Sequence, residues 1–110
     1  MTAYVVARLR NVRMGEGIEA YLQGVDATLA PFGGRYLVHG AGKEVLEGAW
    51  PEDLVVVAFP DADSARAWYR SPAYRAILPF RTGNSEADLV LVPGVRDGHR
   101  ATDILGPPAR

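Results

Sequence analysis

Residues 46–81 decide the fold: LEGAWPEDLVVVAFPDADSARAWYRSPAYRAILPFR. A polar and aromatic loop leads into Leu54–Phe59, which is apolar throughout and typical of a central strand covered on both faces. Asp61 is a preferred N-cap and opens a predicted helix with an apolar face. Ser71 and Pro72 then end that helix and start a second, because this pair is favoured at a helix N-terminus. The order of strand, loop, strand and helix is half of a split β-α-β unit.

The residues on either side supply the other half of the unit. Apolar side chains at three- and four-residue steps predict an amphipathic helix over 16–32, which Gly33 and Gly34 end. Three further strands are predicted, at 3–9, 35–39 and 88–92. The complete order is β-α-β-β-α-β, so the sequence predicts an α+β, ferredoxin-like fold with a four-stranded antiparallel sheet and both helices on one face.

Strand alternation assigns side chains to faces. In the strand 35–39 it predicts Arg35, Leu37 and His39 on one face and Tyr36 and Val38 on the other. A turn at 40–43 and a short return segment at 44–47 are expected to follow. Six strand residues share parity and are candidates for one sheet face or the other: Tyr4, Val6, Val55, Val57, Leu89 and Leu91.

The sheet face without helices would expose apolar side chains, and such a face is an interaction site by default. Two sheets packing face to face as a two-fold homodimer would cover it. We expect one domain over 1–95, followed by a flexible or partner-contacting tail over 96–110 that is rich in Gly, Pro, Arg and Asp.

The composition excludes several classes of function. The 12 basic and 13 acidic residues leave a net charge of -1, which gives no basic field for nucleic acid. The chain has no cysteine, which excludes disulfides, iron–sulfur clusters and Cys-ligated zinc, and its two histidines lie too far apart for a zinc signature. We expect no metal and no cofactor. No leader-like or membrane-length apolar run is seen, so we expect a cytoplasmic protein without a membrane partner.

Three segments carry a resemblance to a known family: GGRYLVHG at 33–40, VLEGAW at 45–50 and VVVAFPDADSARAWYRSPAYRAILPFR at 55–81. Over about residues 3–95 the chain resembles domain of unknown function 1330, in the dimeric α/β-barrel superfamily. The resemblance implies a ferredoxin-like protomer paired sheet to sheet, and no established activity. At superfamily level the relatives include cofactor-independent monooxygenases, lactone isomerases, haem-handling enzymes and small-molecule sensors, so the fold alone does not give a function.

Two polar residues near the predicted hairpin are candidates for chemistry. His39 is either a general base or simply a polar residue that ends a strand. Glu47 is either a carboxylate at the mouth of a cleft or half of an ion pair that holds the hairpin, with Arg35 as its natural bidentate partner. Strand register decides whether they meet, and the sequence leaves that open.

Tyr74 and Arg81 form the second candidate pair. They are seven residues apart and share one helix face if the helix runs through Pro79, a residue that is otherwise expected to limit its length. In that case a hydroxyl and a guanidinium together suit a carboxylate or enolate oxygen. The alternative is that Tyr74 packs in the core and Arg81 pairs with an acidic residue.

The remaining candidates have structural alternatives. Trp50 either stacks on an aromatic ligand or covers the end of the barrel, and Ser71 is first of all a helix cap. Trp68 and Tyr69 are expected in the core.

These residues predict a small cleft between sheet and helices. The catalytic candidates are His39, Glu47 and Arg81, and the ligand-binding candidates are Arg35, Trp50, Ser71 and Tyr74. They suit cofactor-free isomerase-like or monooxygenase-like chemistry on a small carbonyl or aromatic compound, with His39 or Glu47 as base. The alternative is a non-catalytic ligand-binding or stress-related module. A third hypothesis, haem handling, has only His39 as an axial ligand.

Overall fold

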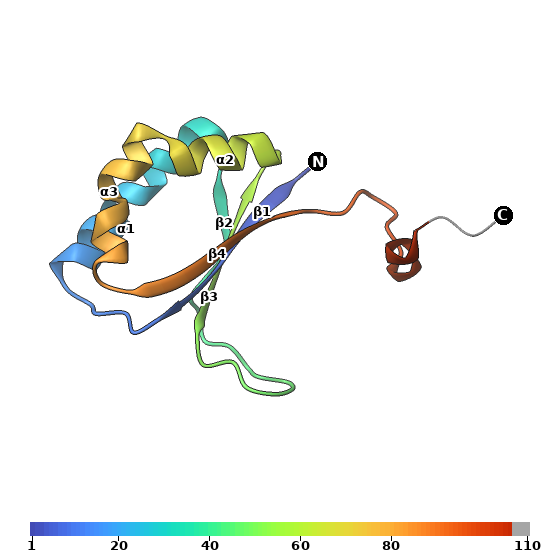
Figure 1. The fold of residues 1–110 in the computed structure, drawn as a ribbon, viewed down its shortest axis with the longest axis horizontal. Helices are drawn as coiled ribbons and strands as arrows, with labels where there is room; N and C mark the ends of the chain where they lie inside the picture. Colours follow the sequence, from blue (N-terminus) through green and yellow to red (C-terminus); the bar gives the residue numbers. More distant parts are fainter. Residues whose placement is uncertain (107–110) are drawn as a thin grey trace.

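The computed structural model describes residues 1–106 and confirms the predicted order of elements (Figure 1). The strands are β1 (Ala3–Arg10), β2 (Arg35–His39), β3 (Asp53–Phe59) and β4 (Glu86–Pro93). The helices are α1 (Glu16–Leu29), α2 (Ala62–Arg70) and α3 (Pro72–Thr82), with the short 3₁₀ helices η1 (Ala30–Phe32) and η2 (Ala101–Leu105). Within this part of the chain, no helix is long and apolar enough to cross a bilayer.

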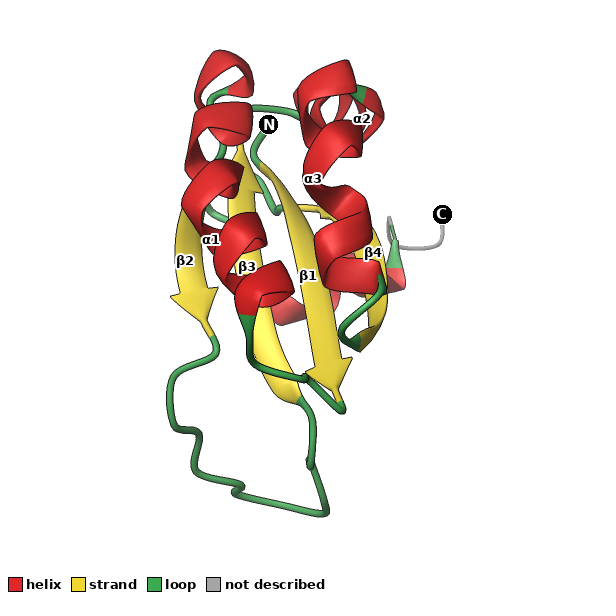
Figure 2. Cartoon of the chain, turned by 90° about the vertical axis from the view of Figure 1, so that its left-hand side faces the viewer, coloured by secondary structure: helices red, strands yellow, loops and turns green. Residues whose placement is uncertain are grey.

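The strands form one antiparallel sheet in the order β2-β3-β1-β4, and the three α-helices cover a single face of it (Figure 2). Crossover connections carry the chain from β1 through α1 to β2, and from β3 through α2 and α3 to β4. The fold is therefore α+β and ferredoxin-like, as the order of elements predicts.

The core lies between this sheet face and the helices. Val5 of the central strand β1 pairs with Val57 of β3 and Leu91 of β4, which places all three on the helix-covered face. Phe59 and Trp68 pack with ring centroids 5.5 Å apart, and the Trp68 indole N–H donates a 3.0 Å hydrogen bond to the buried hydroxyl of Thr28. Trp68 and Tyr69 pack on this core, as expected.

A β-bulge changes the predicted faces of β2. Tyr36 pairs with Val57 but Val38 pairs with Val56, so Leu37 is an extra residue without a partner. The bulge turns Tyr36 and His39 toward the helices and leaves Arg35 and Val38 on the opposite face. The prediction that Arg35 and His39 share a face was therefore wrong, because simple alternation holds only in a regular strand.

The segment between β2 and β3 is a loop. Residues 41–52 form no strand and are exposed almost throughout, so the return segment predicted at 44–47 was wrong. Its apolar residues Val45 and Leu46 stand between polar and glycine residues, and so short an apolar run does not sustain a strand. Gly48, at φ 72°, adopts a left-handed conformation that suits glycine. The loop projects beyond the end of the sheet (Figure 2).

Both predicted caps form. The carboxylate of Asp61 accepts a 2.7 Å hydrogen bond from the backbone N–H of Ser64, and the hydroxyl of Ser71 accepts one of 3.3 Å from the N–H of Tyr74. Helix α3 continues through Pro79 to Thr82, so Pro79 does not limit its length. Pro79 has no backbone N–H, so the helix lacks one hydrogen bond at this residue but continues on both sides of it. Residues two turns apart on α3 therefore share a face.

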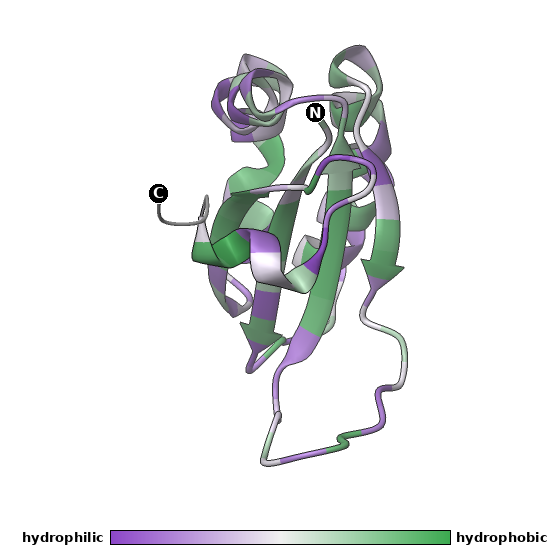
Figure 3. Ribbon diagram, turned by 90° about the vertical axis from the view of Figure 1, so that its right-hand side faces the viewer, coloured by the Kyte–Doolittle hydropathy of each residue, from purple (hydrophilic) through white to green (hydrophobic). Residues whose placement is uncertain are grey.

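The sheet face opposite the helices is turned toward the viewer in Figure 3, and the strand register places apolar side chains along much of it. Of the six candidates that share strand parity, Tyr4 and Val6 lie on this face, and the other four lie on the helix side. Its apolar residues are Tyr4, Val6, Val38, Leu54, Val56, Ala58, Val90 and Val92. We call this set the outer sheet face.

After β4 the chain runs away from the sheet, on the side opposite the helices (Figure 1). Ile104 and Leu105 in η2 are 84% and 80% exposed. The radius of gyration is 16.3 Å, compared with roughly 13 Å for a compact chain of this length. The predicted tail extends to Arg110, and its residues 107–110 lie outside the described part of the chain.

Candidate functional site

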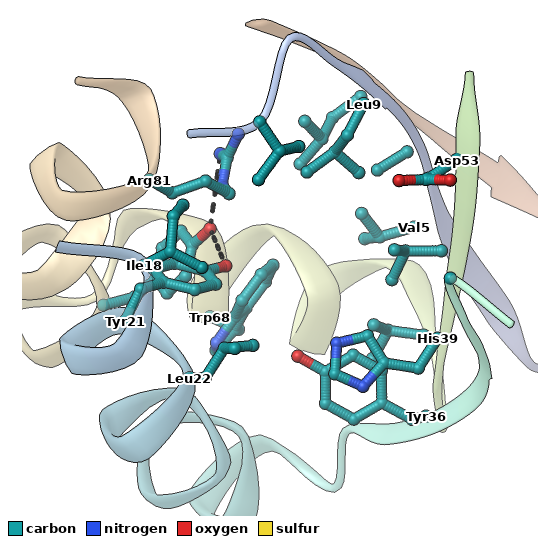
Figure 4. Close-up of a pocket in the computed structure, with 17 residues that line it drawn as sticks. Val5, Leu9, Ile18, Tyr21, Leu22, Tyr36, His39, Asp53, Trp68 and Arg81 are labelled. Carbon is teal, nitrogen blue, oxygen red and sulfur yellow. Dashed lines mark hydrogen bonds between the residues drawn. The ribbon is translucent and has the colours of Figure 1, made fainter. Parts of the chain in front are cut away.

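A cavity of about 200 Å³ lies between the sheet and the helices (Figure 4). Its walls are mostly aliphatic. Five side chains bring ionisable or hydroxyl groups to it from the helices and from β2, and a sixth comes from the start of β3: Tyr21, Tyr36, His39, Asp53, Tyr74 and Arg81. An engineered apolar cavity of roughly 150 Å³ holds benzene, so this volume suits one ring with a substituent.

The sequence makes this space by placing a small residue at the centre of the sheet. Ala7 of β1 pairs with Val55 on one side and Leu89 on the other, and all three line the cavity. The side chain of Ala7 ends at Cβ, so the helices above it do not meet a large side chain there. Trp68 lines the cavity as well as the core.

A buried cluster of three polar side chains forms one wall. The guanidinium of Arg81 donates a 3.5 Å hydrogen bond to the hydroxyl of Tyr74, and that hydroxyl lies 2.8 Å from the hydroxyl of Tyr21 (Figure 4). Tyr74 is fully buried and Arg81 is only 7% exposed. Helix α3 positions two of these residues and α1 the third, so the packing of the two helices brings the cluster together.

Arg81 has no acidic partner in the cluster. No carboxylate within residues 1–106 lies within 4.0 Å of its guanidinium, so the alternative of a structural ion pair is not observed there. Burial lowers the pKa of Arg81, but the oxygens of Tyr74 and Tyr21 raise it by more, and the pKa stays above its ordinary value. The wall of the cavity therefore carries a permanent positive charge.

Tyr21 and Tyr36 stay protonated at neutral pH. Burial, with the neighbouring Tyr74, raises the pKa of Tyr21 far above its usual range. Burial also raises the pKa of Tyr36 to about 12. Both phenols can therefore donate hydrogen bonds to a ligand across the physiological pH range.

The exposed members of the lining mark the mouth of the cavity. His39 ends β2, and its ring stacks on that of Tyr36 with centroids 4.3 Å apart. Asp53 begins β3, two residues before the partner of His39, so it lies diagonally across the strand pair on the same face. Such diagonal neighbours have Cα atoms roughly 7–8 Å apart. Figure 4 shows His39 and Arg81 on opposite sides of the cavity.

The structure brings together three of the seven predicted site residues: His39, Tyr74 and Arg81. Glu47 and Trp50 lie exposed in the loop between β2 and β3, and neither lines this cavity. Arg35 begins β2 on the outer sheet face, so it lies at the far end of that strand from the loop that carries Glu47. Within residues 1–106 no ion pair joins Arg35 to Glu47.

Ser71 serves the helices rather than the cavity. Its hydroxyl donates to the carbonyl of Trp68 at 2.8 Å and accepts from the backbone N–H of Tyr74. Both bonds are local, and Ser71 is not among the residues that line the cavity.

Sequence reasoning did not single out Tyr21, Tyr36 or Asp53. Tyr21 lies in the apolar stripe of α1. Its hydroxyl could have indicated a place in the site, because a buried tyrosine hydroxyl needs a hydrogen-bond partner. Strand alternation placed Tyr36 on the face opposite His39, because the alternating pattern of a strand gives no indication of a bulge. No group of three or more metal-ligating side chains is found within residues 1–106.

Comparison with known proteins adds a family and a fold. The model of the family described as Domain of unknown function (DUF1330) matches residues 2–95. RPA0582 of Rhodopseudomonas palustris, a protein of unknown function, is 18% identical, with 86% of this chain and 83% of that chain covered at a TM-score of 0.67. None of the curated proteins matches this chain.

Two further solved structures share the fold at lower identity. SnoaB of Streptomyces nogalater, a cofactor-independent oxygenase, is 15% identical, with 90% of this chain and 98% of that chain covered at a TM-score of 0.59. A dimeric ferredoxin-like protein of unknown function from Jannaschia sp. CCS1 is 10% identical, with 86% and 100% covered at a TM-score of 0.58. At these identities the likeness shows the fold alone.

Proposed function

The chain belongs to the DUF1330 family. We propose that it binds a small carbonyl or aromatic compound and moves a proton on it without a cofactor. One observation carries the proposal: a buried cation with two phenols on one side of an apolar cavity, and an imidazole on the other. The arrangement suits isomerase-like or monooxygenase-like chemistry.

His39 is the base in this proposal. Imidazole is the side chain best suited to take up a proton near neutral pH. It would remove a proton from a carbon next to a carbonyl group, and the electron pair of that C–H bond would move onto the carbonyl oxygen. Arg81 and Tyr74 would stabilise the oxyanion, because fixed donors act strongly where water is excluded. Return of the proton to another carbon gives an isomer, and reaction of the carbanion with O₂ gives an oxygenated product.

The fold is compatible with such chemistry. SnoaB, which shares the fold, is a cofactor-independent oxygenase, so a ferredoxin-like protomer can support oxygenation without a cofactor. This likeness supports the reaction class and says nothing about the substrate.

The alternative is a binding protein without turnover, and the exposure of His39 at the mouth favours it. A base that is open to water is less insulated than one inside the cavity. In this case the cavity would hold its ligand through Arg81 and the tyrosines alone.

Hydrogen–deuterium exchange distinguishes the two functions. A panel of small ketones, aromatic acids and phenols would be incubated with the protein in D₂O, and loss of carbon-bound proton signals would be followed by NMR. We expect exchange with the unaltered protein and at least a 100-fold slower rate with His39→Asn, at unchanged melting temperature. If compounds of the panel bind but none of them exchanges a carbon-bound proton, the alternative of a binding protein without turnover is established. The matched control is His99→Asn in the tail.

We further propose a homodimer that buries the outer sheet face. Its support is the apolar character of that face, the exposed apolar residues of η2, and the dimeric state of the Jannaschia protein. The tail after β4 leaves its own protomer and would then lie against the second copy. Trp50 and Glu47 lie in a projecting loop, away from the cavity of their own protomer. They would join a site only if the dimer brought this loop close to the partner.

A further inference from the structure

We propose that the cavity selects small monocarboxylates, with the carboxylate held by Arg81 and the pair Tyr21 and Tyr74. The inference rests on the proposed function, because it names the substrate class of the same cavity. The three residues meet only in the folded chain, and their hydrogen bonds leave donors free for one anionic group.

The charge of Arg81 has no anionic partner among residues 1–106 and therefore favours an anion that is present before any reaction. Its guanidinium is 7% exposed, and within residues 1–106 no carboxylate lies within 4.0 Å of it. The hydroxyl of Tyr74 and the ring of Tyr21, whose centroid lies 5.7 Å from the guanidinium carbon, already stabilise this cation, but neither supplies a negative charge. A neutral carbonyl oxygen would add only another dipole. A carboxylate compensates the charge fully and matches the planar fork of the guanidinium with two parallel hydrogen bonds.

The tyrosines supply one more donor, whichever way their shared hydrogen bond runs. The oxygen of Tyr74 accepts from Arg81, and the two hydroxyls, 2.8 Å apart, share one proton between them. Two hydroxyls carry two protons, so one remains for a ligand. Where Tyr21 carries that proton, its raised pKa retains it at neutral pH.

Size and charge limit the rest of the ligand. The cavity of about 200 Å³ has room for one ring or a branched chain of similar volume, and the walls around that space are mostly aliphatic. Arg81 is the one Lys or Arg residue in the lining. Asp53, at the mouth, would repel a second negative charge on the ligand. Monocarboxylates should therefore bind better than dicarboxylates of the same shape.

A carboxylate at this position also fits proton transfer. His39 would break a C–H bond conjugated with the carboxylate and take its proton, and the electron pair of that bond would spread onto the carboxylate oxygens. The added charge would appear where Arg81 and the free phenolic proton already lie. The same contacts would bind the substrate and strengthen as the charge develops.

The test compares benzoate with benzamide, which has nearly the same shape but no charge. Both are titrated into ¹⁵N-labelled full-length protein at pH 7.5, and binding is followed by NMR shifts, including the side-chain Nε–H signal of Arg81. We expect benzoate to bind about 10- to 100-fold more tightly than benzamide, the gain typical of hydrogen bonds to a charged group. Terephthalate should bind less tightly than benzoate.

Two variants separate the role of Arg81 from a general effect of charge. Arg81→Met should remove the preference for benzoate, whereas Arg75→Met should keep it, because Arg75 lies on the same helix with its guanidinium over the ring of Tyr69. If Arg81→Met does not fold, Tyr74→Phe serves instead and should weaken benzoate binding several-fold more than benzamide binding.

The outcomes are distinct. Equal or tighter binding of benzamide to the unaltered protein overturns the carboxylate inference and leaves the small-molecule cavity of the proposed function intact. Selective binding of benzoate that survives in Arg81→Met also overturns it, because the selectivity then arises elsewhere. Absence of shifts at the cavity with every compound up to 50-fold excess overturns both. Selective binding of benzoate, together with no proton exchange in any compound of the ketone, acid and phenol panel, supports the inference and removes the catalytic proposal.

Discussion

Arg81 donates a hydrogen bond to the hydroxyl of Tyr74, seven residues earlier on the same helix, across a helical turn that contains Pro79. The relationship depends on α3 continuing past its proline, since a helix that ended there would release Arg81 to solvent. Tyr21 completes the cluster from α1. Four predictions test what this structure implies for stability, pH dependence and assembly.

The hydroxyls of Tyr21 and Tyr74 stabilise the fold through their mutual hydrogen bond. Tyr74→Phe keeps the buried ring but removes the oxygen that accepts from Arg81, so we expect a loss of about 1–3 kcal/mol in the free energy of unfolding. Urea denaturation measures it. Tyr69→Phe, on a neighbouring ring, is the control. A double-mutant cycle with Tyr21→Phe should show coupling of at least roughly 0.5 kcal/mol, and strict additivity would contradict the prediction.

Stability should fall at high pH. The pKa of Tyr36 is about 12 in the folded chain because of burial, compared with 10.0 for the free phenol. Between these values the folded state holds more protons than the unfolded state, so the free energy of unfolding decreases as pH rises. The raised pKa of Tyr21 acts in the same direction. Urea denaturation at pH 8, 10 and 11.5 should show a decrease below roughly 1 kcal/mol between the first two and a decrease of more than roughly 2 kcal/mol by the last.

Tyr36→Phe provides the comparison for this pH effect. Without the phenol, Tyr36 no longer contributes to the pH dependence of the free energy of unfolding. The variant should therefore lose less stability between pH 10 and 11.5 than the unaltered chain. Identical pH profiles for the two proteins would show that Tyr36 titrates normally in the fold.

Thr28 should matter more than its size implies. Its hydroxyl is the acceptor for the indole N–H of Trp68 at 3.0 Å, and it donates to the carbonyl of Val25 at 2.7 Å. Thr28→Val leaves the buried indole donor without that acceptor, with an expected cost of about 1–3 kcal/mol. Thr82→Val is the control, because Thr82 is exposed near the end of α3. Equal melting temperatures for the two variants would contradict the assignment.

The outer sheet face should set the state of association. Val90→Lys places a charge on this face, in the edge strand β4, on a side chain that is 56% exposed in the isolated protomer. We expect the protomer to stay folded and the dimer to dissociate, measured by light scattering after size-exclusion chromatography. Ala67→Lys puts the same charge on an exposed position of α2 and should leave the dimer intact. A monomeric unaltered chain would end the dimer proposal.

Much of the fold follows from local patterns. The apolar run Leu54–Phe59, the cap at Asp61 and the pair Ser71–Pro72 each specify a local conformation, and the confirmed order of elements leaves few topologies open. The spacing of Tyr74 and Arg81 was also readable, because two helical turns separate them. These features depend on neighbours along the chain, so the sequence alone determined the fold. It also proposed the pair Tyr74 and Arg81, but whether they share a face was decided by the continuation of α3 through Pro79.

Only the tertiary structure decided the rest of the site. Tyr21 reaches Tyr74 because α1 packs against α3, a contact over 53 residues that no periodicity reports. The bulge at Leu37 brought His39 and Tyr36 to the cavity and sent Arg35 to the opposite face, since one extra residue reverses every side chain beyond it. Glu47 and Trp50, close to His39 in sequence, lie in a loop that leaves the sheet. Register and packing are properties of pairs of distant segments, and for that reason they had to be seen in the folded chain.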